Sequence, residues 1–191
     1  MLTLNFTSFP ELHTQRVVLR EYQPSDAIAL FEMRANEGVA RYIDREKPQT
    51  VADSEAMVGM IRAGFEELQK PVWAIALKEN PTLMIGSIGF YGLDLANHRG
   101  EIGYMLSPAH WRKGIISECL ERTIRFGFED MKLHSIMAMI NPGNEASRQI
   151  LLKHGFVKVA YFREDHYFNG KFLDTEMYGL LKSEISGKLE A

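Results

Sequence analysis

Two cationic side chains, Arg112 and Lys113, stand directly before Gly114 in the stretch HWRKGIISE, which then continues as a run that favours a helix. The first turn of a helix carries unpaired N–H donors and the positive end of the helix dipole, and a glycine there lets an anion approach the main chain closely. The stretch therefore predicts an anion site on backbone amides. It is neither a Walker motif nor a Rossmann fingerprint. An ordinary surface loop is the competing interpretation.

A second polar segment, NPGNEASRQILLKHGF, follows a predicted strand and puts Asn144 and Ser147 three residues apart at the start of the next helix. Gly155 is expected to end that helix in a left-handed conformation. Ser147 has a hydroxyl that could contact a ligand, although a serine at this place often only satisfies helix amides.

Hydrophobic periodicity predicts the elements that hold these segments. Helices are predicted at residues 28–33, 51–68, 115–128 and 146–154, with Thr50 as the N-cap of the second. Asn80-Pro81 and Asn169-Gly170 are turn signals, the latter for a hairpin. The resulting order is mixed α/β and does not repeat a nucleotide-binding βαβ unit. Strands are predicted at residues 17–22, 72–77, 84–91, 100–106, 134–140, 156–162 and 172–181.

Composition narrows the class of protein. A chain of 191 residues with 46% hydrophobic residues fits one domain, which we expect to span 1–191 with its core at about 10–182. The net charge of -3, from 22 basic and 25 acidic residues, argues against nucleic-acid and anionic-membrane partners. One cysteine, no signal-peptide pattern and no long apolar span favour a cytoplasmic protein.

The ordered combination of four segments resembles the GNAT superfamily of acyl-CoA-dependent N-acyltransferases, and within it the RimJ/RimL-like ribosomal-protein N-acetyltransferases. The segments are LHTQRVVLREYQPSDAIALF, EIGYMLSPAHWRKGIISE, the N-x-x-S segment ending in KHGF, and YFNGKFLDTEMYGL. The resemblance implies a single-domain fold with a twisted mixed sheet flanked by helices. Two central parallel strands, at residues 101–106 and 134–140, would splay apart to admit the pantetheine arm of a CoA thioester.

The same resemblance implies acetyl-CoA as co-substrate and no metal. The family's usual Q/R-x-x-G-x-G/A motif has Trp111 at its first position here and Ile116 at its last. Because the contact is made by main-chain N–H groups, a larger side chain at 116 can point into the core. The implied CoA-binding residues are Met105, Leu106, Arg112, Lys113, Gly114, Ile115, Ile116, Ser117, Asn144 and Ser147.

An amine must be neutral to attack a thioester, so a base or a water relay must remove a proton. Glu101, at the start of its strand, is the first candidate, and His166, four residues before the hairpin glycine, is the second; each is otherwise a surface side chain. Many GNAT enzymes carry a tyrosine four residues after the N-x-x-S serine, where this chain has Leu151. The departing thiolate would then take its proton from Ser147, from water, or from one of Tyr104, Tyr161 and Tyr167. Cys119, inside a helix pattern, is expected to be a core residue.

We therefore expect an acetyl-CoA-dependent N-acetyltransferase that acts on a protein N-terminal α-amine, as the RimJ/RimL resemblance implies. A small-molecule amine, such as an amino acid, polyamine or antibiotic, is the close alternative, and a non-catalytic acyl-CoA sensor is the alternative from another class. The region of Phe31, Met33 and Tyr42 and the helix from Val51 should cover the acceptor side. The sequence leaves a homodimer open.

Overall fold

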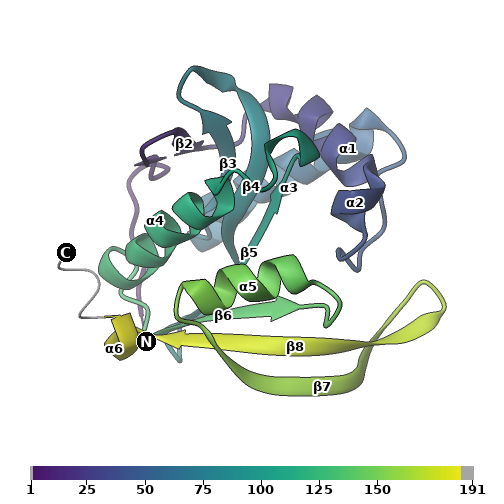
Figure 1. Cartoon of the computed structure of the whole chain (residues 1–191). Coiled ribbons are helices and arrows are strands. Elements are labelled where there is room, and N and C mark those ends of the chain that lie inside the picture. Colours follow the sequence, from purple (N-terminus) through teal and green to yellow (C-terminus); the bar gives the residue numbers. More distant parts are fainter. Residues whose placement is uncertain (1, 186–191) are drawn as a thin grey trace.

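An eight-stranded sheet in the order β1-β2-β3-β4-β5-β6-β8-β7 organises the computed structural model, which describes residues 2–185 (Figure 1). Neighbouring strands are antiparallel except β5 and β6, which are parallel. The sheet is mixed, as predicted. The strands are β1 Leu12–His13, β2 Val17–Arg20, β3 Val72–Leu77, β4 Asn80–Asp94, β5 Arg99–Leu106, β6 Ser135–Ile140, β7 Val157–Phe168 and β8 Lys171–Leu181.

Helices cover both faces of the sheet. The helices α1 and α3 lie over one face, and α4 and α5 lie over the other (Figure 1). None of the described helices is both long and apolar enough to cross a membrane. The helices are α1 Ala27–Ala35, α2 Glu37–Ala40, α3 Val51–Leu68, α4 Ile115–Glu129, α5 Glu145–Lys153 and α6 Lys182–Ile185, with 3-10 turns at Pro24–Asp26 and Pro108–His110.

Local sequence accounts for the helix that begins at Val51. The Thr50 hydroxyl accepts the amide of Asp53, and the Asp53 carboxylate accepts the amide of Thr50, which forms a reciprocal capping box. Both the predicted N-cap and the predicted range of α3 are therefore confirmed. The helix α4 also follows its periodicity, because its stripe of apolar residues is buried against the sheet: Ile116, Leu120, Ile124 and Phe128.

The turn predicted at Asn80-Pro81 is wrong. The chain reverses at residues 78–79, and Leu77 pairs with Asn80, so β4 already begins at Asn80. The carbonyls of Pro81 and Thr82 accept hydrogen bonds from the Arg20 side chain at 2.7 and 3.1 Å. Arg20 thus holds the first residues of β4 in an extended conformation that proline tolerates at a strand start.

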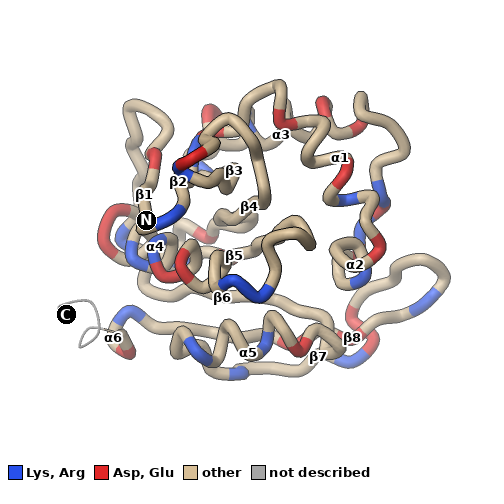
Figure 2. Tube along the Cα trace, turned by 45° about the horizontal axis from the view of Figure 1, so that its top comes forward, with Lys and Arg blue, Asp and Glu red and all other residues tan. Residues whose placement is uncertain are grey.

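The two parallel strands at the centre of the sheet separate after three residue pairs. Arg99, Gly100 and Glu101 of β5 pair with residues 135–137 of β6, and no pair follows. Residues 102–106 and 138–140 therefore have no ladder partner across this gap, which confirms the predicted splay. Acidic and basic residues are intermixed along the trace around it, without a large face of one sign (Figure 2).

Candidate functional site

Six successive backbone amides at the start of α4, those of residues 112–117, have no hydrogen-bond acceptor within the described part of the chain. Arg112 and Gly114 have φ angles of 60° and 75°, and Gly114 is the N-cap of the helix with no side chain capping it. Unpaired donors at a helix start, together with the helix dipole, form an anion site. We call residues 112–117 the amide cradle.

A distant arginine fixes the amide cradle in place. Arg16, which precedes β2, donates to the Lys113 carbonyl at 2.8 Å and pairs with Glu118 at 2.7 Å. The side chains of Ile115 and Ile116 are buried in the core. The larger residue at position 116 therefore leaves its own amide free, and the departure from the family motif does not block the cradle.

The end of α5 adds an imidazole and a cation beside the amide cradle. The Ser117 hydroxyl lies 2.7 Å from Nε2 of His154 and accepts a hydrogen bond from Lys153 at 3.3 Å. The first turn of α4 is thus tied to the last turn of α5. Together with Arg112 and Lys113, Lys153 gives this edge a positive charge that suits a phosphate group.

Two hydroxyl groups meet where the strands splay. The Tyr104 hydroxyl, from β5, lies 2.7 Å from the Ser147 hydroxyl of α5. The Ser147 amide donates to the Asn144 side chain at 3.1 Å, so Asn144 acts as the N-cap of α5. Burial raises the pKa of Tyr104 to about 12, against a smaller opposing effect of Ser147. Tyr104 therefore keeps its proton at neutral pH and can donate it.

The other tyrosines named from the sequence lie elsewhere. Tyr161 donates to Asp174 within the β7–β8 hairpin, and Tyr167 is largely exposed and packs on Phe172. Leu151 is fully buried in the core. Tyr104 could be distinguished by strand alternation, which puts it on the same face as Ile102 and Leu106 and hence toward α4 and α5.

Glu101 lies on the opposite face of β5 from Tyr104, at the last residue that pairs with β6. It is half-buried in a strand that has a neighbour on each side, so it is not the exposed surface side chain of the alternative interpretation. Burial raises the pKa of Glu101, and the positive charge of Arg45 opposes that shift. A carboxylate with a raised pKa beside a gap in the sheet is suited to general-base work.

His166 has hydrogen-bond partners other than Glu101. Its Nε2 is 3.1 Å from the Asp44 carboxylate, and its Nδ1 is 3.5 Å from Asp165. No hydrogen bond between His166 and Glu101 occurs among residues 2–185. The contact with Asp44 joins the β7–β8 hairpin to the loop at residues 41–50.

This loop, which contains Tyr42, and α2 lie beside the splay. A Cβ on Gly38 would come within 2.9 Å of the Trp111 ring, and a Cβ on Gly143 within 3.3 Å of the Tyr42 ring. Trp111 in turn donates from its indole to the Leu106 carbonyl at 2.7 Å. Together, α2 and the loop therefore contact both sides of the gap. The carbonyl of Leu106, named from the sequence as a CoA ligand, already has one partner inside the chain.

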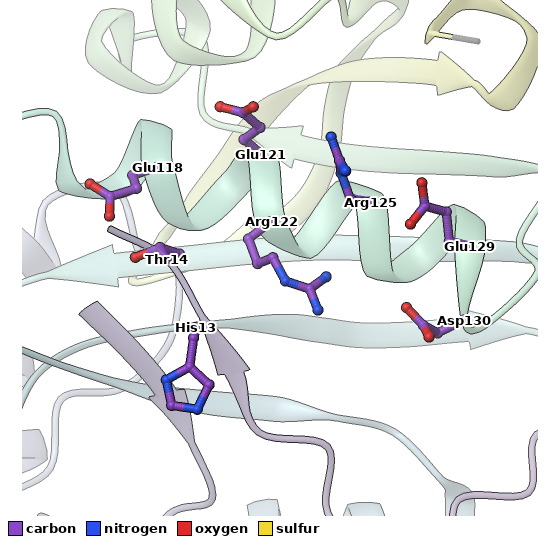
Figure 3. A pocket seen from close by; sticks show the side chains of 8 residues that line it. All are labelled: His13, Thr14, Glu118, Glu121, Arg122, Arg125, Glu129 and Asp130. Atoms are coloured by element: carbon purple, nitrogen blue, oxygen red, sulfur yellow. The ribbon is translucent and has the colours of Figure 1, made fainter. Parts of the chain in front are cut away.

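A surface hollow of about 580 Å³ lies on the outer face of α4 and contains none of the predicted site residues (Figure 3). Acidic and basic side chains both line it, and the helix turns its apolar stripe away from it. Such a lining is typical of the solvated face of an amphipathic helix. The hollow is lined by His13, Thr14, Glu118, Glu121, Arg122, Arg125, Glu129 and Asp130.

Cys119 is not suited to covalent chemistry. It is fully buried in α4, and burial raises its pKa to about 12. A thiolate, which is the reactive form, is therefore scarce at neutral pH. Among residues 2–185 no three His, Cys, Asp or Glu side chains are grouped so that they could hold a metal ion.

Comparison with known proteins assigns the family. The acetyltransferase (GNAT) domain matches residues 16–157. The chain belongs to the GNAT acetyltransferases. The uncharacterised N-acetyltransferase YoaA of Bacillus subtilis is 36% identical over 174 residues, which are 91% of this chain and 98% of that protein.

Solved GNAT structures share the fold. The GNAT-family acetyltransferase from Bacillus anthracis has a TM-score of 0.80 and 27% identity, covering 92% of this chain and all of that one. RimL, a ribosomal α-N-protein acetyltransferase solved with coenzyme A, has a TM-score of 0.79 and 18% identity, covering 88% and 95% of the two chains. This GNAT protein is accordingly an acyltransferase that uses acetyl-CoA. Its amide cradle and splayed strands fit a diphosphate and an extended amide-bearing arm, respectively.

Proposed function

We propose that this enzyme transfers an acetyl group from acetyl-CoA to a protein N-terminal α-amine by direct attack on the thioester. The observation that carries the proposal is the position of Glu101 and Tyr104 on opposite faces of β5 at the splay. An acceptor on the α1 and α3 face and a thioester on the α4 and α5 face would meet there. The α-N-protein specificity named for RimL, which shares the fold, supports the choice of acceptor. The acceptor class implies a cytoplasmic location, where ribosomal proteins are made.

CoA binding is assigned to the residues around the splay. The amide cradle, residues 112–117, would hold the diphosphate, with Arg112 and Lys113 supplying charge at its edge. The free edge of β5 at Met105, together with Asn144 and Ser147 at the start of α5, would border the pantetheine arm. Acetyl-CoA supplies the activated thioester when bound.

The chain's own residues then handle the protons. Glu101 takes a proton from the acceptor amine, directly or through one water, so that the nitrogen lone pair can form the bond to the acetyl carbon. The carbon–sulfur bond breaks, and Tyr104 gives its proton to the departing sulfur. Ser147, 2.7 Å from the Tyr104 hydroxyl, can return a proton from solvent. No covalent enzyme intermediate is needed, in keeping with the buried Cys119.

Tyr104→Phe should lower kcat roughly 10-fold, because the departing sulfur loses its proton donor, while CoA affinity stays within about 2-fold. Stopped-time thiol-release assays and calorimetry with CoA measure the two quantities. Tyr161→Phe is the matched control, since that phenol bonds to Asp174 on the exposed hairpin. Equal rates for Tyr104→Phe and Tyr161→Phe would assign the proton to Ser147 or water instead.

The acceptor class can be tested with a thiol-release panel. N-terminal peptides with free α-amines should give kcat/KM values at least about 10-fold above those of polyamines, aminoglycosides and free amino acids. The same peptides with acetylated N-termini are the control and should be inactive unless a lysine side chain is the acceptor. Higher turnover of a small amine would move the enzyme to the small-molecule class. If CoA bound tightly but none of the amines in the panel caused thiol release, the non-catalytic acyl-CoA sensor would be favoured.

A further inference from the structure

Within residues 2–185, two arginines on the α1 and α3 side, Arg34 and Arg45, have no carboxylate partner. Arg34, in the last turn of α1, is only 9% exposed, and its Nε–H is buried with no acceptor. In the described part of the chain, the Arg34 side chain donates one hydrogen bond, to the main-chain carbonyl of Glu46 at 3.0 Å. Arg45 comes from the exposed loop at residues 41–50. Within residues 2–185, neither Arg34 nor Arg45 forms an ion pair.

Tyr91 and the charge of Arg45 connect these arginines with Glu101. A Cβ on Gly103 would come within 3.0 Å of the Tyr91 ring, so Tyr91 lies over β5 two residues from Glu101. Burial and the charge of Arg45 both lower the pKa of Arg34, with Tyr91 opposing them. Arg45 also acts on the carboxylate of Glu101. Arg45 therefore interacts electrostatically with both Arg34 and Glu101, and Tyr91 lies over β5 next to Glu101.

Comparison with Arg20 shows that Arg34 is unusual within this chain. Both are 9% exposed, but Arg20 donates two hydrogen bonds of 2.8 Å to the buried carboxylate of Asp26. Burying a guanidinium without a counter-charge is costly, and a structural arginine is normally compensated as Arg20 is. Within residues 2–185, Arg34 thus has no acidic partner that would offset the cost of its burial.

We propose that Arg34 and Arg45 bind a carboxylate carried by the acceptor itself, so that the preferred substrate is an amine with an anionic group close to the nitrogen. This specificity rests on the proposed transfer at Glu101. A guanidinium offers a planar pair of donors that matches a carboxylate. The carboxylate can belong to an acidic residue at or near a peptide N-terminus or to a free amino acid, and the experiment below separates the two sources.

The same two charges would also assist the chemistry. A cation close to an ammonium group lowers the pKa of that group, which increases the fraction of neutral amine available for attack. A second cationic group on the acceptor would meet the repulsion of both arginines. Polyamines and aminoglycosides, which carry several ammonium groups, are therefore disfavoured as acceptors.

The test compares acceptors that differ only in one charge. In the first set, glutamate is compared with glutamine, and aspartate with asparagine, as residue one or two of C-terminally amidated peptides. In the second set, free amino acids are compared with their α-amides. In at least one set, the carboxylate member should have a kcat/KM at least about 10-fold higher. The set that shows the preference identifies the source of the carboxylate.

Variants tie the preference to the two arginines. Arg45→Gln, at an exposed position, should reduce the preference to below about 3-fold, and Arg34→Gln should abolish it, while CoA affinity is unchanged. Arg34→Lys keeps the charge and should retain part of the preference, even if Arg34→Gln fails to fold. Arg62→Gln is the matched control, because Arg62 on α3 already pairs with Glu21 at 3.2 Å. It should behave as the unaltered enzyme.

Binding measurements separate failure of this specificity from failure of the transfer itself. Calorimetry with CoA present compares the N-acetylated acid and its N-acetylated amide, and it needs no turnover. If no acceptor were turned over but binding still depended on the carboxylate, the proposed function would be contradicted and the anion site supported. The anion site would be overturned if an active enzyme gave equal rates within every pair of acceptors. It would also be overturned if the preference survived both Arg45→Gln and Arg34→Lys unchanged, or if an inactive enzyme showed no carboxylate-dependent binding.

Discussion

Glu101→Gln is expected to lower the acetyl-transfer rate about 100-fold or more while CoA affinity stays within about 2-fold. Glutamine keeps the shape and the hydrogen-bonding surface of the side chain but cannot take a proton from the acceptor. Single-turnover assays with the true acceptor measure the chemical step, and calorimetry measures CoA binding. A loss of rate with a parallel loss of CoA affinity would instead indicate a disturbed splay.

The dependence of the acetyl-transfer rate on pH should show whether Glu101 acts as the base. Because burial raises the pKa of Glu101, the rate of the unaltered enzyme should rise with pH through that raised value, as the carboxylate loses its proton. The Glu101→Gln variant should lack this limb. The acceptor amine also titrates, so the limb is assigned to Glu101 only if it disappears in the variant while the acceptor is unchanged.

Thermal stability provides the control for folding. A raised pKa means that the folded chain holds the Glu101 proton more strongly than the unfolded chain does. Its contribution to the free energy of unfolding is therefore full below the unfolded-state pKa and is lost as pH rises through the folded-state value. At neutral pH, Glu101→Gln should have a melting temperature equal to or above that of the unaltered enzyme. A lower one would show that lost activity comes from misfolding.

His166→Gln is the matched comparison for the base. His166 contacts Asp44 and thereby joins the hairpin to the loop at residues 41–50, so its loss should reduce the rate by less than about 5-fold. The opposite ranking of the two variants would transfer the base to His166. Near-normal rates in both would mean that the cleft only positions an already neutral amine.

Local signals in the sequence predicted the elements whose ends are fixed by neighbouring residues. Thr50 and Asp53 define the start of α3, and Asn169 and Gly170, with φ angles of 49° and 80°, form the predicted hairpin turn. The early start of β4 could not be predicted, because it depends on hydrogen bonds from Arg20, some 60 residues away in the chain. The four-residue α2 is too short to show periodicity.

The candidate site likewise contains residues that neighbouring sequence predicted and residues that depend on distant contacts. The amide cradle is contiguous, so its residue types and spacing predicted it. The contact between Tyr104 and Ser147 joins residues 43 positions apart, and the sequence could only place Tyr104 among three tyrosines. Arg34 was not predicted at all, since a buried arginine without a partner has the same sequence signature as a paired one on a helix surface. Its significance depends on which carboxylates are absent around it in the described structure.

Backbone strain and loss of the cradle must be separated when Gly114 is replaced. At a φ of 75°, a β-branched residue is strained by about 1–2 kcal/mol, although a Cβ there would meet only Arg16, at an ordinary 3.5 Å. Gly170 has nearly the same φ, 80°, with open space around it on the hairpin. Gly170→Val therefore carries the same strain without touching the cradle.

Gly114→Val should weaken CoA binding more than about 10-fold, because its side chain would stand where a diphosphate approaches the amides of residues 112–117, and relaxing the strain would turn those amides away. Gly170→Val should lose similar thermal stability but keep its CoA affinity. Arg112→Ala and Lys113→Ala should each weaken binding less, by an amount that shrinks as salt rises, since their charges are exposed to screening. Calorimetry across a salt series distinguishes the contributions. If folded Gly114→Val bound CoA as tightly as Gly170→Val, the diphosphate would have to bind elsewhere, and the six unpaired amides would have to bind a different ligand.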